Sequence, residues 1–75
     1  MTVTELELRE TLAAVLNRPT REIAGDANLV LLGISSLEIM RLVSRWRRQK
    51  LPVSFEALVT EPTLDQWLAH LNAAA

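Results

Sequence analysis

The chain has 75 residues, no cysteine and a formal net charge of −1. This length suits a single small domain over residues 1–75, with a modest core and no room for a deep substrate pocket. The composition excludes a disulfide framework, and the charge balance is not typical of a nucleic-acid-binding domain. No apolar run approaches the roughly 20 residues that span a membrane.

The beginning of the chain, MTVTELELRE, has no basic region followed by an apolar one. The sequence therefore predicts no secretory signal, and we expect a cytoplasmic protein. Met1 favours a free-standing protein, although a piece excised from a longer protein can begin in the same way. We also expect a monomer.

The first helix is predicted over residues 4–16. Capping-box spacing fits Thr4 with Glu7 and equally fits Thr2 with Glu5. Apolar residues recur at helical spacing and are expected to face the core: Leu8, Leu12, Val15 and Leu16.

A long connection follows over residues 17–35. It contains both glycines of the chain, Gly25 and Gly33, at places where turns are expected. Three apolar residues are expected to hold this connection against the domain: Ile23, Leu29 and Leu32. A loop of this length inside a small domain is often functional.

Three more helices complete the prediction, and no segment shows convincing alternation of period two. The second helix covers residues 36–49, a short one covers residues 54–60, and the last begins with the Thr63–Gln66 capping-box spacing. The expected core positions are Ile39, Leu42, Val43 and Trp46, then Leu58, then Leu64, Trp67, Leu68 and Leu71. The fold class is therefore all-α, with three main helices, one short helix and a long first loop.

Two adjacent serines lie at the start of the second helix, in the stretch LLGISSLEIM. Ser35 and Glu38 have capping-box spacing, which gives Ser35 a structural role. Ser36 would then occupy the first helical position with a free side chain, at the end of the helix where an attached phosphate is favoured. From spacing alone, two ordinary capping serines remain the commoner interpretation.

The stretch Gly33-Ile-Ser-Ser-Leu37 resembles the attachment motif of acyl, peptidyl and aryl carrier proteins, Gly-x-Asp-Ser-Leu/Ile. The stretches MRLVSRWRRQ, VSFEAL and PTLDQWL extend the resemblance to thiolation domains of nonribosomal peptide synthetases, over residues 6–71. Aryl carrier domains of siderophore assembly lines, including those of isochorismatase-type bifunctional proteins, are the most similar. Two positions depart from the family pattern: Ser35 replaces the usual Asp, and Lys50 replaces a glycine after the second helix.

The resemblance implies that Ser36 carries a covalent 4′-phosphopantetheine arm derived from coenzyme A. The arm would hold an aminoacyl, aryl or acyl group as a thioester for nonribosomal peptide-type biosynthesis, such as that of an antibiotic or siderophore. The chain would then be no enzyme, with neither catalytic residues nor a metal site. It would act with a phosphopantetheinyl transferase, an adenylation enzyme and a condensation or tailoring enzyme. The identity of the cargo stays open.

The partner-binding surface implied by the resemblance combines the second helix with the short helix after it. By position it includes Leu37, Met40, Arg41, Phe55 and Val59, although Phe55 and Val59 fit a core role equally well. The strongly basic second helix favours peptide-synthetase-like partners over those of fatty acid synthesis, whose carriers have an acidic second helix.

Two alternatives remain on the residues alone. A small helical nucleic-acid-binding module would use the arginine-rich second helix and bind in a salt-dependent way, but the basic residues are confined to one short stretch. A docking or scaffold domain would have the same fold and never receive the arm. The single histidine, His70, is expected on the surface near a helix end, and Trp46 and Trp67 are expected in the core.

Overall fold

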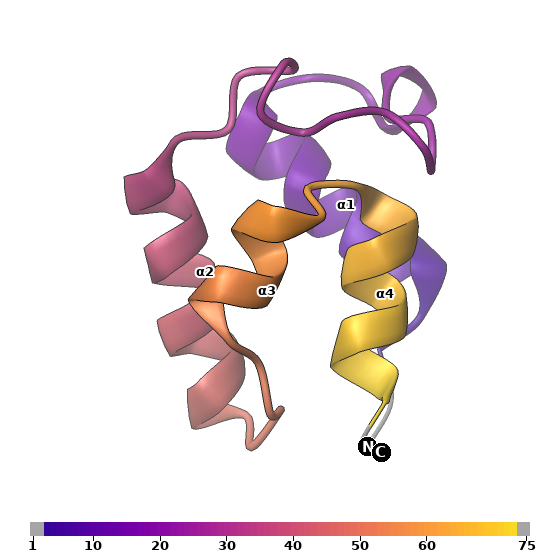
Figure 1. Cartoon of the computed structure of the whole chain (residues 1–75). Coiled ribbons are helices and arrows are strands. Elements are labelled where there is room, and N and C mark those ends of the chain that lie inside the picture. The colour runs from indigo at the N-terminus through magenta and orange to yellow at the C-terminus, as the bar shows by residue number, and fades with distance from the viewer. Residues whose placement is uncertain (1–2, 74–75) are drawn as a thin grey trace.

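The computed structural model describes residues 3–73, and over that range it contains four α-helices and one 3-10 helix (Figure 1). The elements are α1 (Glu5–Leu16), η1 (Thr20–Glu22), α2 (Ser36–Arg48), α3 (Phe55–Thr60) and α4 (Leu64–Asn72). The predicted all-α fold with one short helix and a long first loop is confirmed. The structure adds η1, which interrupts that loop and was not predicted.

The helices begin where hydroxyl side chains cap them. Thr4 Oγ1 accepts the Glu7 N–H at 3.1 Å, and Thr63 Oγ1 accepts the Gln66 N–H at 3.2 Å. Each bond satisfies a backbone donor that the first turn leaves without a helical partner. The alternative capping residue Thr2 lies outside the described residues.

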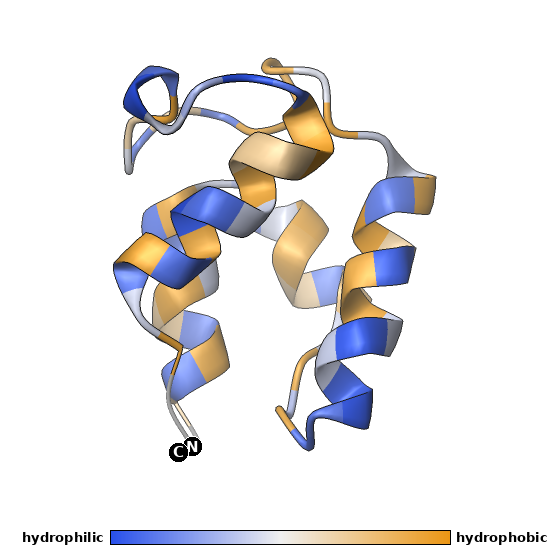
Figure 2. Cartoon of the chain, turned by 180° about the vertical axis from the view of Figure 1, so that it is seen from behind, coloured by the Kyte–Doolittle hydropathy of each residue, from blue (hydrophilic) through white to orange (hydrophobic). Residues whose placement is uncertain are grey.

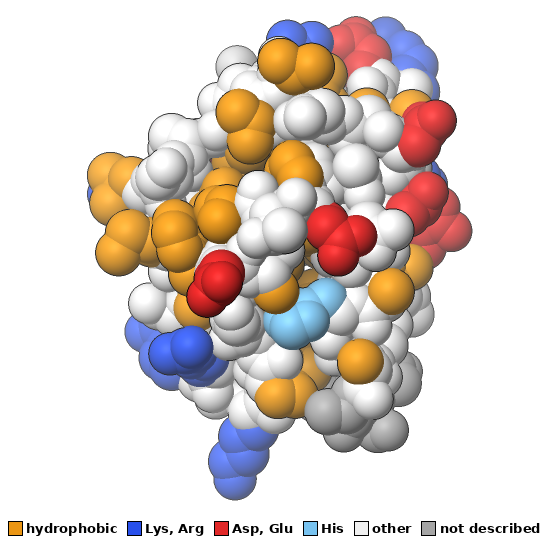
Figure 3. Space-filling view, in the orientation of Figure 1, with side chains coloured by type: hydrophobic (Ala, Val, Ile, Leu, Met, Phe, Trp, Pro, Cys, Tyr) orange, Lys and Arg blue, Asp and Glu red, His pale blue; other side chains and the backbone are white. Residues whose placement is uncertain are grey.

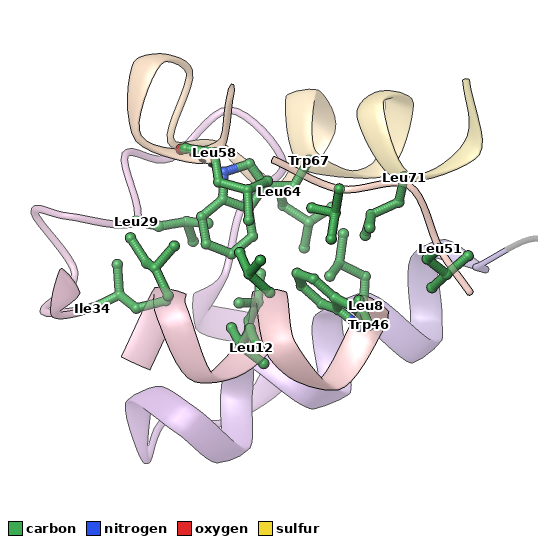
Figure 4. Close-up of a cluster of buried hydrophobic side chains, with 14 of the residues drawn as sticks. Leu8, Leu12, Leu29, Ile34, Trp46, Leu51, Leu58, Leu64, Trp67 and Leu71 are labelled. Carbon is green, nitrogen blue, oxygen red and sulfur yellow. Dashed lines mark hydrogen bonds between the residues drawn. The ribbon is translucent and has the colours of Figure 1, made fainter. Parts of the chain in front are cut away.

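One hydrophobic cluster receives side chains from all four α-helices and from the loop (Figure 4). The rings of Trp46 and Trp67 meet edge to face at its centre, with centroids 6.2 Å apart and planes at 85°. Both tryptophans are buried, as predicted. Most predicted core positions are also buried, but four are only partly so: Val15, Leu16, Leu32 and Leu68.

The loop between α1 and α2 is fixed to the α3–α4 connection. The Leu29 N–H donates to the Pro62 carbonyl at 2.7 Å, and the Asp65 N–H donates to the Gly25 carbonyl at 3.0 Å. Ile23 and Leu29 are buried, as predicted. The long loop therefore has a defined path across one end of the helices, and it leads to the start of α2 (Figure 1).

The C-terminal end of α2 closes in a Schellman motif. The Leu51 N–H donates to the Trp46 carbonyl at 2.9 Å, and the Lys50 N–H donates to the Arg47 carbonyl at 3.0 Å. Lys50 has φ 63°, the left-handed conformation that glycine adopts at lower cost. The lysine that replaces the family's glycine thus still turns the chain, and it places Leu51 in the core.

The two ends of the described chain are paired side by side. Asn72 Oδ1 accepts the Val3 N–H at 2.8 Å, and Asn72 Nδ2 donates to the Val3 carbonyl at 2.9 Å. Seen from behind in Figure 2, the start of α1 and the end of α4 lie together here, away from the start of α2. Among residues 3–73, no helix has the length and apolar character needed to cross a membrane.

Candidate functional site

The start of α2 is held by a reciprocal pair of hydrogen bonds between Ser35 and Glu38. Ser35 Oγ accepts the Glu38 N–H at 3.1 Å, and the Ser35 N–H donates to Glu38 Oε1 at 2.9 Å. This is the capping box predicted from the sequence. It gives the Ser35 hydroxyl a structural role and fixes the backbone that leads into Ser36.

Ser36 is the first residue of α2, and its side chain is exposed. No hydrogen bond recorded within the described residues uses its hydroxyl. Gly33, three residues earlier, has φ 111°, a conformation that favours glycine in the turn before α2. A phosphodiester fits at Ser36: the group would extend into solvent, and its charge would lie at the positive end of the α2 dipole.

Several apolar side chains are exposed on α2, on α3 and on the loop before α2. Leu37 is 57% exposed and Met40 is 55% exposed, while Val59 of α3 is 38% exposed. In Figure 3 the hydrophobic side chains gather over the N-terminal half of α2 and over α3. Leu31, at the loop tip, is 84% exposed. Sequence reasoning missed it, although an apolar pair (Leu31 with its neighbour Leu32) next to a glycine turn was visible in the sequence.

A surface groove of about 320 Å³ lies between α2 and α3. It brings together Met40 and Phe55, two of the residues predicted to bind partners. Phe55 is half-buried, and it packs against the core as well as lining this groove. Arg47 lines the same groove, where its Nε donates to the Val53 carbonyl at 3.1 Å.

Arg41, the remaining predicted partner residue, lies on the other edge of α2. It is exposed and lines a second groove of about 260 Å³ between α1 and α2, together with Arg45. The apolar part of that groove comes from Val15 and Leu42, and Glu38 lies at its end. The predicted partner residues therefore do not share one groove: Met40 and Phe55 line the groove between α2 and α3, and Arg41 lines the groove between α1 and α2.

His70 is not a plain surface residue, contrary to the sequence-based expectation. It is half-buried, and its Nε2 accepts the Ser54 N–H at 3.2 Å. Ser54 is the N-cap of α3, so His70 links α4 to the start of α3. No spacing in the sequence indicates this bond, because the partner atom is a backbone group on a distant segment.

Residues 7–71 match the family described as "Phosphopantetheine attachment site". The chain is 37% identical over 66 residues to phenyloxazoline synthase MbtB of Mycobacterium tuberculosis, and the aligned region covers 88% of this chain and 5% of that protein. It is 33% identical over 60 residues to an isochorismatase of Bacillus subtilis, covering 80% of this chain and 19% of that protein. It is 40% identical over 72 residues to malformin synthetase mlfA of Aspergillus niger, covering 96% of this chain and 2% of that protein.

The chain thus spans less than one fifth of the length of each of these relatives. The family match, in contrast, covers nearly the whole chain. The resemblance seen in the sequence is confirmed: the chain belongs to the phosphopantetheine-attachment family of carrier domains, whose cofactor is covalently bound 4′-phosphopantetheine.

Proposed function

We propose that this chain is a carrier for nonribosomal peptide-type biosynthesis and that Ser36 is its attachment residue. The observation that carries the proposal is the division of roles between the two serines. The Ser35 hydroxyl is engaged in the cap of α2, while the exposed Ser36 hydroxyl at the next position is accessible. A transferase can reach Ser36 without undoing the cap.

The chain's own residues hold and present the arm rather than perform chemistry. The first turn of α2 offers backbone N–H groups and a positive dipole end to the phosphodiester on Ser36. The Ser35–Glu38 capping box keeps that turn formed. The arm supplies the thiol that the cysteine-free chain lacks, and this thiol holds an aminoacyl, aryl or acyl group as a thioester. The carrier itself is no enzyme.

Partners of three kinds follow from this role: a phosphopantetheinyl transferase, an adenylation enzyme, and a condensation or tailoring enzyme. The candidates for binding them are the exposed Leu37, Met40, Arg41 and Val59, together with the half-buried Phe55. A domain of this size offers each partner a small interface, which favours transient contacts. Attachment to the carrier raises the effective concentration of the cargo at each partner, so tight binding is unnecessary.

The test is to measure the intact mass of the purified protein after incubation with coenzyme A and a broad-specificity phosphopantetheinyl transferase. We expect a gain of one phosphopantetheine in the wild type and in Ser35→Asp, which keeps a capping side chain. Ser36→Ala should show no gain. A folded wild type that stays unmodified by several transferases would contradict the proposal and favour a scaffold domain without the arm.

A further inference from the structure

The charges of this chain are segregated, although its net charge is only −1. Residues 36–50, which are α2 and its C-terminal turn, contain five basic residues and one acidic residue. The rest of the chain contains three basic and eight acidic residues. In Figure 3 basic side chains lie near the C-terminal end of α2, while most acidic side chains on that face lie toward α4.

The basic residues of α2 are not neutralised from within. The two salt bridges among residues 3–73 are Arg9–Glu5 and Arg18–Glu22, and neither involves α2. Glu38 is the single acidic residue of α2, and its carboxylate accepts the Ser35 N–H.

Helix stability does not account for all of these arginines. Cations in the last turn of a helix interact favourably with its dipole, which explains Arg45, Arg47 and Arg48. Arg41 is in the middle of α2 and gains nothing from this effect. With Arg45 it forms a like-charged pair four residues apart, which destabilises a helix by about 0.2–0.5 kcal/mol. The dipole of α2 thus gives no reason for Arg41.

Arg41 and Arg45 form the basic wall of the groove between α1 and α2. The opposite edge of α2 bears Met40, which faces Phe55 across the other groove. Exposed Leu37 lies between the two edges. The outer surface of α2 therefore has an apolar edge toward α3, at Met40, and a basic edge toward α1, at Arg41 and Arg45; Arg47 lies farther along the edge toward α3.

We infer that the partner surface that docks on α2 is amphipathic and acidic. It places apolar side chains against Leu37 and Met40, and Asp or Glu carboxylates against Arg41 and Arg45. Charge complementarity then fixes which way round the partner lies on the helix, and it steers the encounter. This inference rests on the proposed carrier role and adds the chemistry of the partner to it.

The surface favours a protein over an extended polyanion. A nucleic acid that ran beyond α2 would meet the acidic remainder of the domain, where eight carboxylates lie outside residues 36–50. Such a ligand would also leave Leu37 and Met40 without apolar contacts. An acidic amphipathic helix satisfies both edges of α2 together.

The test uses three helical peptides with the same leucine stripe, flanked on one side by Glu, Gln or Lys. Each is titrated into the ¹⁵N-labelled protein at low and at high salt, and amide shifts are mapped onto the fold. We expect the Glu peptide to shift the amides of Leu37, Met40, Arg41 and Arg45. It should bind about tenfold more tightly than the Gln peptide, a difference that salt removes.

Two double variants, each of which removes two arginines, separate the effect of this surface from the effect of the protein's net charge. Arg41→Gln/Arg45→Gln should lose the preference for the Glu peptide, whereas Arg18→Gln/Arg21→Gln should keep it. Equal binding of the three peptides, no binding of any, or an equal loss in both double variants would overturn the inference. Tighter binding of a single-stranded oligonucleotide than of the Glu peptide would overturn it in favour of a nucleic-acid ligand.

The titration is run on the protein before and after treatment with the transferase. Because peptide docking on α2 does not require the arm, the two claims fail separately. A protein that binds the Glu peptide but never gains phosphopantetheine would contradict the proposed function alone. A protein that is modified at Ser36 but does not discriminate among the peptides would contradict the docking inference alone.

Discussion

Ser35 and Glu38 each donate a backbone N–H to the side chain of the other, at 2.9 and 3.1 Å. Ser35→Ala removes one of these bonds and should lower the free energy of unfolding by about 1 kcal/mol. Ser35→Asp should cost little, because Asp is as good an N-cap. The measurement is urea denaturation followed by circular dichroism. Ser36→Ala is the matched control, and an equal loss in that variant would contradict the division of roles.

Trp67 satisfies a carbonyl that the helix cannot. Its Nε1 donates to the Leu58 carbonyl at 2.9 Å. The helical donor for that carbonyl would come from residue 62, which is proline and has no N–H. Trp67→Phe should therefore cost about 1–3 kcal/mol more than Trp46→Phe, since only the first leaves a buried carbonyl unpaired. Equal losses in the two variants, measured by urea denaturation, would contradict this account.

The His70–Ser54 hydrogen bond ties α4 to the start of α3. His70→Ala should lower the free energy of unfolding by about 1 kcal/mol and speed hydrogen exchange at the Ser54 amide. Gln offers an acceptor at a similar reach, so His70→Gln should recover much of both effects. Unchanged exchange at Ser54 in His70→Ala would show that the bond adds no local protection.

Two residues with positive φ should respond to substitution in opposite directions. The left-handed conformation costs a residue such as Lys50, at φ 63°, roughly 1–2 kcal/mol. Glycine avoids this conformational cost, but it also loses more backbone entropy on folding, which offsets part of the gain. Lys50→Gly should therefore raise the free energy of unfolding by about 0.5–1 kcal/mol. Lys50→Ala removes the same charge without relieving the backbone, and it should bring no gain.

Gly33, at φ 111°, gives the opposite case. Gly33→Ala meets no neighbouring atom, so any loss comes from the backbone itself. We expect a fall of about 1–3 kcal/mol in the free energy of unfolding. Melting temperatures and urea midpoints of the three variants provide the check. A neutral Gly33→Ala would contradict the assignment of strain at this turn.

Local sequence patterns predicted the helices well, because helix starts depend on residues three apart. Ser35 and Thr63 cap their helices as their hydroxyl spacing predicted, and Thr4, one of the two candidates at the first helix, caps α1. The buried face of α2 followed from periodicity in the same way. Membership of the phosphopantetheine-attachment family was predicted from short motifs, which are also local features of the sequence.

The path of the long loop could not be predicted, because distant segments hold it. Leu29 bonds to Pro62, and Gly25 bonds to Asp65; neither pair has a spacing signal. The same reason hid the role of His70. The burial of Phe55 stayed ambiguous for another reason. An apolar side chain at a helix start can pack against the core, line a surface groove, or do both. Phe55 does both.

The attachment residue can be located without altering the chain. Trypsin cuts after Arg21 and Arg41, and it releases residues 22–41, whose only hydroxyl side chains are Ser35 and Ser36. Fragment ions of this peptide, taken from the transferase-treated wild type, assign the added phosphopantetheine to one serine. The account predicts that the whole gain lies on Ser36. A gain on Ser35 would contradict it, because the modified hydroxyl would then be the one that caps α2.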